Sequence, residues 1–224
     1  MTVRSSKFEI RHWGLLLVTD RRQAGGRGLL PAVESALAGG VRAVQLREKD
    51  LPALELCRLA ESLLCRTRAA GAALLINDRV DVALAVGADG VHLTRKSLPP
   101  GEARRLLGPD RLLGLSCHSA REACEAASEG VDFAVLGPIF ATPSKAPYGA
   151  PIGLEALREA RAGCGIPLIA IGGITAPRAA ESLAAGADGV AVITAVLAAA
   201  DPAAAARGIL AAVIQARQVG EPGG

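Results

Sequence analysis

Aromatic side chains are scarce in this sequence, which has three Phe, one Trp and one Tyr among its 224 residues. Proteins that bind single-stranded nucleic acid by base stacking need several such rings beside basic residues. The formal net charge of +3 is also too small to predict attraction to a nucleic-acid backbone or an acidic membrane surface. These two shortages argue against nucleic acid and membrane partners.

Long apolar runs and a cysteine framework are missing as well. No run approaches the roughly 18 apolar residues of a membrane span, and the first residues lack the apolar core of a signal peptide. The 5 cysteines are odd in number and show no CxxC spacing, which disfavours both a disulfide framework and a structural zinc site. These features predict a cytoplasmic protein with reduced, buried thiols.

Small and branched aliphatic residues are abundant, and they follow a repeated pattern. Segments such as 87–93 (GADGVHL) and 186–192 (GADGVAV) each place a Gly, a short polar step and then an apolar run. The Gly can end a helix, and a continuous apolar run is typical of a buried parallel strand. Such runs predict strands at residues 15–20, 43–48, 73–78, 90–94, 111–118, 133–140, 167–173 and 189–194. Helical patterns lie between them, for example at residues 51–71, 119–130, 153–163, 176–186 and 201–218.

Strict alternation of strand and helix predicts parallel pairing of the strands. Eight strand–helix units in a chain of this length favour an α/β fold with a single (β/α)8 TIM barrel over an open doubly wound sheet. We therefore expect one barrel domain over residues 14–218, an N-terminal extension at residues 1–13 and a flexible tail at residues 219–224.

The second predicted strand ends in a run of charged residues. Active sites of such barrels lie at the C-terminal ends of the strands. Because side chains alternate along a strand, Gln45, Arg47 and Lys49 share one face and Glu48 faces away. If the shared face is the inner one, an amide and two cations converge on a ligand with several anionic oxygens. The alternative is a solvated loop with salt bridges to neighbouring helices.

Polar residues also end the third and fifth predicted strands. Asn77 and Asp78 offer an amide and a carboxylate, which suit Mg²⁺ or could cap the next helix. Ser116 and His118 share a face, and His118 could exchange protons near neutral pH or cap a helix. His92, at the end of the fourth strand, is expected to be a packed or bridging residue.

A long segment at residues 141–151 follows the sixth predicted strand. It places Thr142, Ser144 and Lys145 among prolines. Hydroxyl groups beside an ammonium group are typical of a phosphate-binding lid, and the alternative is an ordinary loop stiffened by proline.

The last two strands end in glycine and in a short polar step. Gly172 and Gly173 follow the seventh strand, and Ile193 and Thr194 end the eighth. Barrel enzymes often bind phosphate with the backbone amides of these two loops and the N-terminus of a short helix, and glycine lets the backbone approach an oxyanion. Together with the cations after strands two and six, this predicts two anion sites. The ligands would be two small phosphorylated substrates, or one that bridges both sites.

In order and spacing, seven segments of the chain resemble the thiamine phosphate synthase and thiazole tautomerase family over residues 14 to 217. The segments are QLREK (45–49), INDRVDVAL (76–84), GADGVHL (87–93), GLSCHS (114–119), GPIFATPSK (137–145), IAIGGIT (169–175) and AGADGVAVIT (185–194). The resemblance implies a TIM barrel. It also implies a synthase that joins hydroxymethylpyrimidine pyrophosphate to thiazole phosphate, giving thiamine phosphate and pyrophosphate.

The resemblance also implies roles for individual residues. The residues that would hold the pyrimidine pyrophosphate are Gln45, Arg47, Lys49, Asn77, Ser116 and Lys145. Asp78 would bind Mg²⁺, and Thr142 and Ser144 would lie between the two substrates. The thiazole phosphate would be held by Gly173 and by the amides near Ile193 and Thr194.

The sequence departs from the synthase pattern after the fourth strand. Synthases of the family carry Gly-Gln-x-Asp there, and the Asp is a second Mg²⁺ ligand. Here Thr94, Arg95, Lys96 and Ser97 stand at these positions. An uncharged Ser97 is a poor substitute for a carboxylate, so Mg²⁺ would depend on Asp78, and Arg95 or Lys96 could neutralise the pyrophosphate directly.

Two alternatives stay open at this point. The thiazole tautomerase of the same family moves a proton without a metal, has Ser in place of the second metal ligand, and would use His118 as its acid–base group. A non-catalytic barrel that binds the same ligands is the other. The sequence fixes no oligomeric state.

Overall fold

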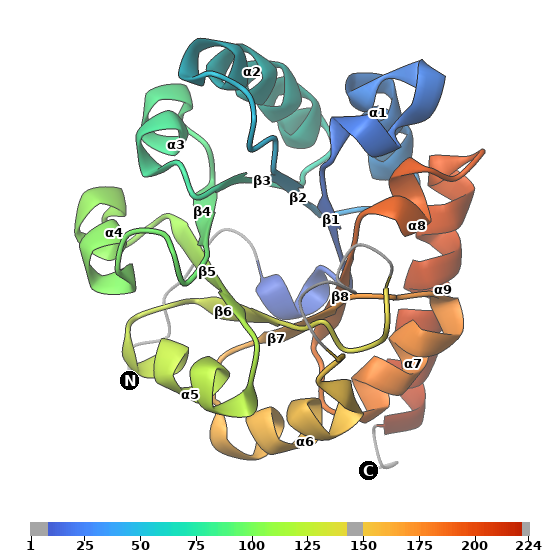
Figure 1. Cartoon of the computed structure of the whole chain (residues 1–224). Coiled ribbons are helices and arrows are strands. Elements are labelled where there is room, and N and C mark those ends of the chain that lie inside the picture. The colour runs from blue at the N-terminus through green and yellow to red at the C-terminus, as the bar shows by residue number, and fades with distance from the viewer. Residues whose placement is uncertain (1–8, 143–149, 221–224) are drawn as a thin grey trace.

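The computed structural model describes residues 9–142 and 150–220, which form one closed barrel of parallel strands (Figure 1). The strands are β1 (Leu15–Val18), β2 (Ala43–Leu46), β3 (Ala73–Asn77), β4 (Gly90–Leu93), β5 (Leu112–Cys117), β6 (Phe133–Leu136), β7 (Leu168–Ile171) and β8 (Gly189–Val192). They pair in chain order, and β8 closes the ring by pairing with β1. The predicted (β/α)8 TIM barrel is confirmed.

Helices surround the barrel and connect successive strands. They are α1 (Leu29–Ala38), α2 (Ala53–Ala69), α3 (Val80–Val86), α4 (Pro100–Leu107), α5 (Ala120–Ser128), α6 (Gly153–Gly163), α7 (Ala176–Ala184), α8 (Thr194–Leu197) and α9 (Pro202–Gly220). Short 3-10 helices are η1 (Ile10–His12), η2 (Arg21–Gln23) and η3 (Gly25–Arg27). No helix in the described residues is long and apolar enough to cross a membrane.

All eight strands end earlier than the sequence pattern predicts, and the residues beyond their ends belong to the loops of the barrel mouth. The strand predicted over 133–140 ends at Leu136, because Pro138 has no N–H to continue the ladder. The strand predicted over 167–173 ends at Ile171 because Gly172 and Gly173 have φ of 101° and 65°, outside the β region. The apolar runs therefore locate the strands correctly, while the polar ends belong to loops.

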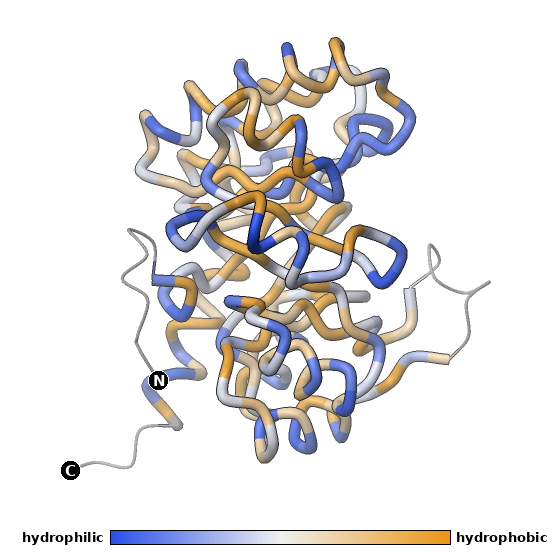
Figure 2. The backbone as a smooth tube through the Cα atoms, turned by 90° about the vertical axis from the view of Figure 1, so that its left-hand side faces the viewer, coloured by the Kyte–Doolittle hydropathy of each residue, from blue (hydrophilic) through white to orange (hydrophobic). Residues whose placement is uncertain are grey.

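Side chains of each strand alternate between the barrel interior and the helix layer. Leu15 and Leu17 of β1 belong to the large cluster that packs beneath the helices, whereas Leu16 and Val18 belong to a smaller cluster inside the barrel. Figure 2 shows apolar stretches mainly in the interior of the molecule and hydrophilic stretches mainly at its periphery. The inward positions at the C-terminal strand ends are therefore those that can present side chains to a ligand.

The floor of the barrel is closed by residues that the sequence assigned to an N-terminal extension. Ile10 and Trp13 are buried in the interior cluster, and the Trp13 ring meets Phe133 edge to face with a centroid distance of 5.4 Å. In Figure 1 the short helix η1 lies at the centre of the ring. Part of the predicted extension is thus core, while residues 1–8 lie outside the described chain.

Two smaller expectations need correction. Helix α9 continues to Gly220, past the predicted boundary at residue 218, and residues 221–224 of the predicted tail lie outside the described chain. The thiols were expected to be buried, and this holds for Cys117 and Cys164, but Cys65 is exposed. Burial raises the pKa of Cys117 to about 12, so this thiol stays protonated.

Candidate active site

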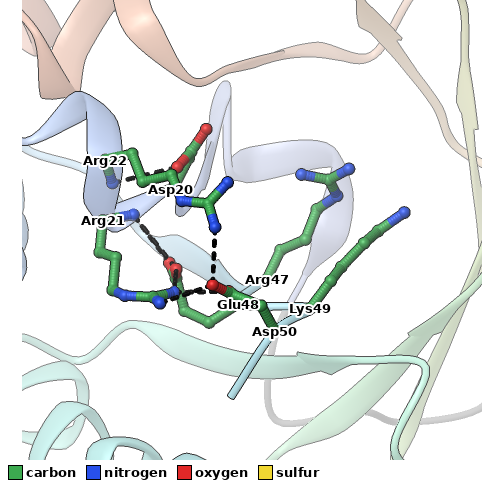
Figure 3. Close-up of a pocket in the computed structure, with 7 residues that line it drawn as sticks. All are labelled: Asp20, Arg21, Arg22, Arg47, Glu48, Lys49 and Asp50. Atoms are coloured by element: carbon green, nitrogen blue, oxygen red, sulfur yellow. Dashed lines mark hydrogen bonds and ion pairs between the residues drawn. The ribbon is translucent and has the colours of Figure 1, made fainter.

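The end of β2 presents two cations to the mouth. Gln45 is buried in the barrel, with 3% of its surface exposed. Arg47 and Lys49 follow it at alternate positions, and in Figure 3 their side chains extend in the same direction, away from the carboxylates of Glu48 and Asp50. A pocket of about 290 Å³ is lined by residues 47–50 together with Asp20, Arg21 and Arg22. The alternation of the strand thus persists into the loop.

Glu48 fixes the loops that follow β1 and β2 to one another. Its carboxylate is buried and accepts hydrogen bonds from the Thr19 hydroxyl at 2.7 Å and from the Arg21 amide at 3.0 Å. The Thr19 hydroxyl in turn accepts a bond from the Arg47 amide at 2.9 Å. The backbone that carries Arg47 is therefore held rigidly at the rim.

Asp50 neutralises the two arginines of the β1 loop. It accepts hydrogen bonds from Arg21 and Arg22 at 2.7 and 2.8 Å, and the hydrogen bond from Arg21 holds the pKa of this carboxyl well below its usual range. Salt bridges therefore do exist in this charged segment, as one reading of the sequence expected. They involve Glu48 and Asp50, which point away from Arg47 and Lys49 (Figure 3).

The end of β3 places a carboxylate at the same rim in an unusual backbone conformation. Asn77 is half-buried, and Asp78 is exposed with φ of 67°. This left-handed region is costly for residues other than Gly and often marks functional sites. The Asp78 amide donates to the His92 carbonyl at 2.9 Å, whereas no described residue donates a hydrogen bond to the Asp78 carboxylate. That carboxylate is available to a ligand or a metal ion.

The loop after β4 does not supply a second metal ligand. The Ser97 hydroxyl accepts a bond from the Thr94 amide at 2.8 Å and lies 3.0 Å from the Thr94 hydroxyl, so it closes a local turn. Arg95 lies against α5, where it donates to the Glu122 carbonyl at 3.0 Å and pairs with the carboxylates of Glu122, Glu125 and Glu129. Arg95 is thus engaged by acidic side chains here, whereas Lys96 is exposed, and a role of either in neutralising pyrophosphate stays a prediction.

Both polar residues at the end of β5 have defined partners. His92 Nε2 lies 2.9 Å from the Ser116 hydroxyl, so His92 is both packed and bridging, as predicted. His92 is buried, and burial followed by the charge of Arg47 lowers its pKa to about 3, which keeps the ring neutral. His118 is exposed and its Nδ1 lies 2.6 Å from the Gly137 carbonyl. A carbonyl only accepts, so Nδ1 carries the proton and Nε2 is the nitrogen that can accept one.

A compact backbone turn follows β7. A Cβ on Gly172 would lie 2.7 Å from the Pro138 Cα, and one on Gly173 would lie 2.6 Å from the Ala141 carbonyl oxygen. Both glycines also have positive φ. A larger residue would therefore clash with these atoms and also strain the backbone. The turn is therefore packed directly against the start of the loop after β6.

Arg178 of α7 holds this turn and the neighbouring loop together. Its guanidinium donates to the Gly173 carbonyl at 2.8 Å and stacks on the Phe140 ring at 4.9 Å from the centroid. The Phe140 amide donates to the Gly172 carbonyl at 3.1 Å. Both carbonyls thus point toward protein donors, an arrangement that leaves other backbone groups of the turn to face a ligand.

The eighth strand leads directly into the short helix α8. Ile193 is the residue before the helix, which begins at Thr194, and the first amides of a helix have no partner within it. Thr142 is half-buried at the edge of the described chain. Ser144 and Lys145 lie outside the described residues.

Metal binding at this rim would rest on one protein carboxylate. In the described ranges 9–142 and 150–220, no group of three or more His, Cys, Asp or Glu side chains could hold a metal ion. Mg²⁺ usually keeps several waters and binds through one or two carboxylates plus substrate phosphates. The open carboxylate of Asp78, together with the oxygens of a phosphorylated ligand, would supply the smaller of these two ligand sets, which has one carboxylate.

Comparison with known proteins identifies the family of the chain. The family described as thiamine monophosphate synthase matches residues 15–196. The chain belongs to this family. It is 51% identical over 205 residues to the thiamine-phosphate synthase of Moorella thermoacetica, covering 92% of this chain and 98% of that protein.

A second relative and a solved structure bear similar names. The thiamine-phosphate synthase of Roseiflexus castenholzii is 49% identical over 193 residues, covering 86% of this chain and 85% of that protein. The solved structure of a thiamine phosphate pyrophosphorylase from Pyrococcus furiosus superposes with a TM-score of 0.85 and 37% identity. That match covers 93% of this chain and 99% of the other.

Sequence reasoning missed residues whose role is to hold other residues of the site in place. Thr19 and Glu48 hold Arg47 in place, and Arg178 holds the Gly173 turn. Thr19 carried a weak signal, because it directly follows the first apolar run just as Arg47 closely follows the second. Arg178 carried none, since an Arg on an amphipathic helix is usually a solvated residue.

Proposed function

We propose that this chain is a thiamine-phosphate synthase, a transferase that joins hydroxymethylpyrimidine pyrophosphate to thiazole phosphate. One observation carries the proposal. Cationic side chains after β2 and a glycine turn after β7 belong to the same barrel mouth, in a chain whose relatives bear this activity as their name. Two anionic substrates of different charge would suit these two kinds of site.

The proposed reaction breaks one bond and forms another. The C–O bond between the pyrimidine methylene and the pyrophosphate breaks, and the electron pair leaves with the pyrophosphate oxygen. The methylene cation that remains is captured by the lone pair of the thiazole nitrogen, which forms the new C–N bond. Arg47 and Lys49 would stabilise the charge that develops on the leaving group, and the closed floor at Trp13 would keep water from the barrel interior.

The substrates would be divided between the two sides of the mouth. The pyrimidine pyrophosphate would be held by Gln45, Arg47, Lys49, Asn77 and Ser116, and also by Lys145 beyond the described residues. Thr142 and Ser144 would lie between the substrates. The thiazole phosphate would be held by backbone groups of Gly172, Gly173, Ile193 and Thr194.

Mg²⁺ is the proposed cofactor, held by Asp78 and by pyrophosphate oxygens. When bound, it would neutralise charge on the leaving group. Asn77 would support the pyrophosphate beside it. The Ser97 hydroxyl is engaged with Thr94 and would take no part, so we expect a higher Mg²⁺ requirement than in relatives with a second carboxylate.

A coupled assay tests the proposal. The enzyme is supplied with the pyrimidine pyrophosphate, aromatic thiazole phosphate and Mg²⁺, and thiamine phosphate and pyrophosphate are measured. We expect equal amounts of the two products, and loss of activity in Lys145→Ala and Asp78→Ala but not in His118→Ala. No thiamine phosphate at any Mg²⁺ concentration would reject the synthase.

The second candidate is the thiazole tautomerase, and two observations favour it. Ser97 replaces a charged ligand, and His118 is held by Gly137 with its Nε2 as the proton-accepting nitrogen. Supplying unaromatised thiazole phosphate without metal separates the candidates. A tautomerase would convert it in a reaction that depends on His118. Substrate binding with no product in either assay would instead indicate a non-catalytic barrel.

A further inference from the structure

His92 and Ser116 form a hydrogen-bonded pair inside the barrel, below the mouth. They come from the adjacent strands β4 and β5, where His92 is paired with Gly114. Ser116 is two residues further on, so its side chain lies on the same inner face, one layer closer to the rim. The Nε2–Oγ distance is 2.9 Å, His92 is 2% exposed and Ser116 is half-buried.

The surroundings of the imidazole decide which nitrogen carries its proton. His92 Nδ1 is buried and has no hydrogen-bond partner in the described part of the chain. A Cβ on Gly114 would lie 2.6 Å from this nitrogen and 2.3 Å from Phe133 Cζ, so the space next to Nδ1 is closed by apolar groups. Buried N–H groups without an acceptor are rare, and a neutral imidazole has one N–H. The proton therefore resides on Nε2.

This tautomer fixes the direction of the hydrogen bond. Nε2–H donates and the Ser116 oxygen accepts. A serine hydroxyl has one proton to donate, and no described residue other than His92 makes a hydrogen bond with the Ser116 side chain. The hydroxyl proton of Ser116 is thus directed to whatever occupies the mouth, and the bond from His92 polarises it toward donation.

We propose that His92 is a positioning residue that sets Ser116 as an obligatory hydrogen-bond donor to a phosphate oxygen of the pyrophosphate-bearing substrate. The proposal rests on the proposed function for the identity of that substrate. It assigns His92 a role without contact with the ligand, and it explains the glycine at residue 114, since a side chain there would displace the imidazole.

The first test needs no substrate. The chain has three histidines, so ¹⁵N-labelled histidine and comparison with His92→Gln assign the signals of residue 92. We expect a neutral ring at pH 6 to 8 with Nε2 protonated and Nδ1 bare. A signal showing protonated Nδ1 would overturn the proposal whatever the enzyme's activity.

The second test uses inorganic pyrophosphate as the probe. His92→Phe removes both nitrogens, whereas His92→Gln keeps an N–H group near the position of Nε2. We expect pyrophosphate to bind about tenfold more weakly to His92→Phe and about threefold more weakly to His92→Gln, with unchanged binding of inorganic phosphate at the glycine turn. Equal losses in both variants, or weaker binding of both anions, would indicate only a packing role.

A double-mutant cycle completes the test. If His92 acts through Ser116, His92→Gln should not weaken pyrophosphate binding any further in a protein that already carries Ser116→Ala. Additive losses would contradict the proposal. Because these readouts are binding and tautomer state, they stand apart from the assay for thiamine phosphate. A chain that binds pyrophosphate as described but makes no product would reject the synthase and retain the His92 inference.

Discussion

The two sides of the barrel mouth would hold anions by different physical means. After β2 and β3, the proposed ligand-facing groups are side chains, those of Arg47 and Lys49 (Figure 3) and of the exposed Asp78. After β7 and β8, the proposed groups are backbone amides beside Gly172 and Gly173, two positions where a Cβ would not fit. Side chains can supply full charges that match a pyrophosphate and a metal ion, whereas amides supply partial charges that suit a single phosphate. A substitution should therefore act on the first side through charge and on the second through shape.

The largest expected effect is on the charged side. Arg47→Ala should raise KM for the pyrimidine pyrophosphate roughly 30- to 100-fold, because a hydrogen bond to a charged group contributes about 1.5–3 kcal/mol. KM for thiazole phosphate should stay within about twofold. Steady-state kinetics with each substrate varied in turn measures both.

Arg22→Ala is the matched control for Arg47→Ala. It removes one positive charge from the same pocket, but Arg22 is 72% exposed and pairs with Asp50. We expect less than a threefold change. An equal effect of the two variants would mean that the general field of the rim, rather than the direction of Arg47, governs binding.

The glycine side should respond to a single methyl group. Gly173→Ala should raise KM for thiazole phosphate about 30-fold and lower the free energy of unfolding by about 1–3 kcal/mol, since φ is 65° and the Ala141 oxygen lies in the way. Gly165→Ala, where a Cβ would meet nothing within 4 Å, should change neither. Thermal unfolding and steady-state kinetics together check this. An unchanged KM in a destabilised Gly173→Ala protein would show that this turn does not bind the phosphate.

Asp78 separates the role of charge from that of backbone shape. Asn tolerates the left-handed conformation, so Asp78→Asn keeps the backbone and removes the charge. We expect the Mg²⁺ concentration for half-maximal activity to rise about tenfold. Asp81→Asn is the control, because that carboxylate is engaged with Arg79. A Mg²⁺ dependence that does not shift in Asp78→Asn would rule out this residue as the ligand.

The smallest expected effect is at Arg178, which is half-buried. A cation–π contact contributes about 0.5–1 kcal/mol even at an exposed site, so Arg178→Ala should raise KM for thiazole phosphate about three- to fivefold. KM for the pyrimidine pyrophosphate should stay unchanged. Arg158→Ala, an exposed arginine of α6 that pairs with Glu155, should have no effect. If Arg178→Ala raised both KM values, the turn would be coupled to the charged side, and the two sides could not be treated as independent.

Sequence reasoning served some residues of the mouth better than others. The order of strands and the alternation at Gln45, Arg47 and Lys49 followed from local periodicity, which needs no knowledge of distant residues. The partners of Arg95 could not be found in the same way. Its position in the chain suggested the mouth, but Glu122 and Glu125 of α5 and Glu129 directly after it draw Arg95 to the outside. That choice depends on how two helical units pack.

By itself, the sequence determined the barrel and which residues follow its strands, because apolar periodicity and glycine positions act over a few residues at a time. Only the tertiary structure decided what those residues bind. The Glu48–Thr19 bond of 2.7 Å joins the loops after two neighbouring strands, and the His92–Ser116 distance of 2.9 Å links two neighbouring strands directly. Such contacts depend on the register between neighbours, which no single stretch of sequence encodes.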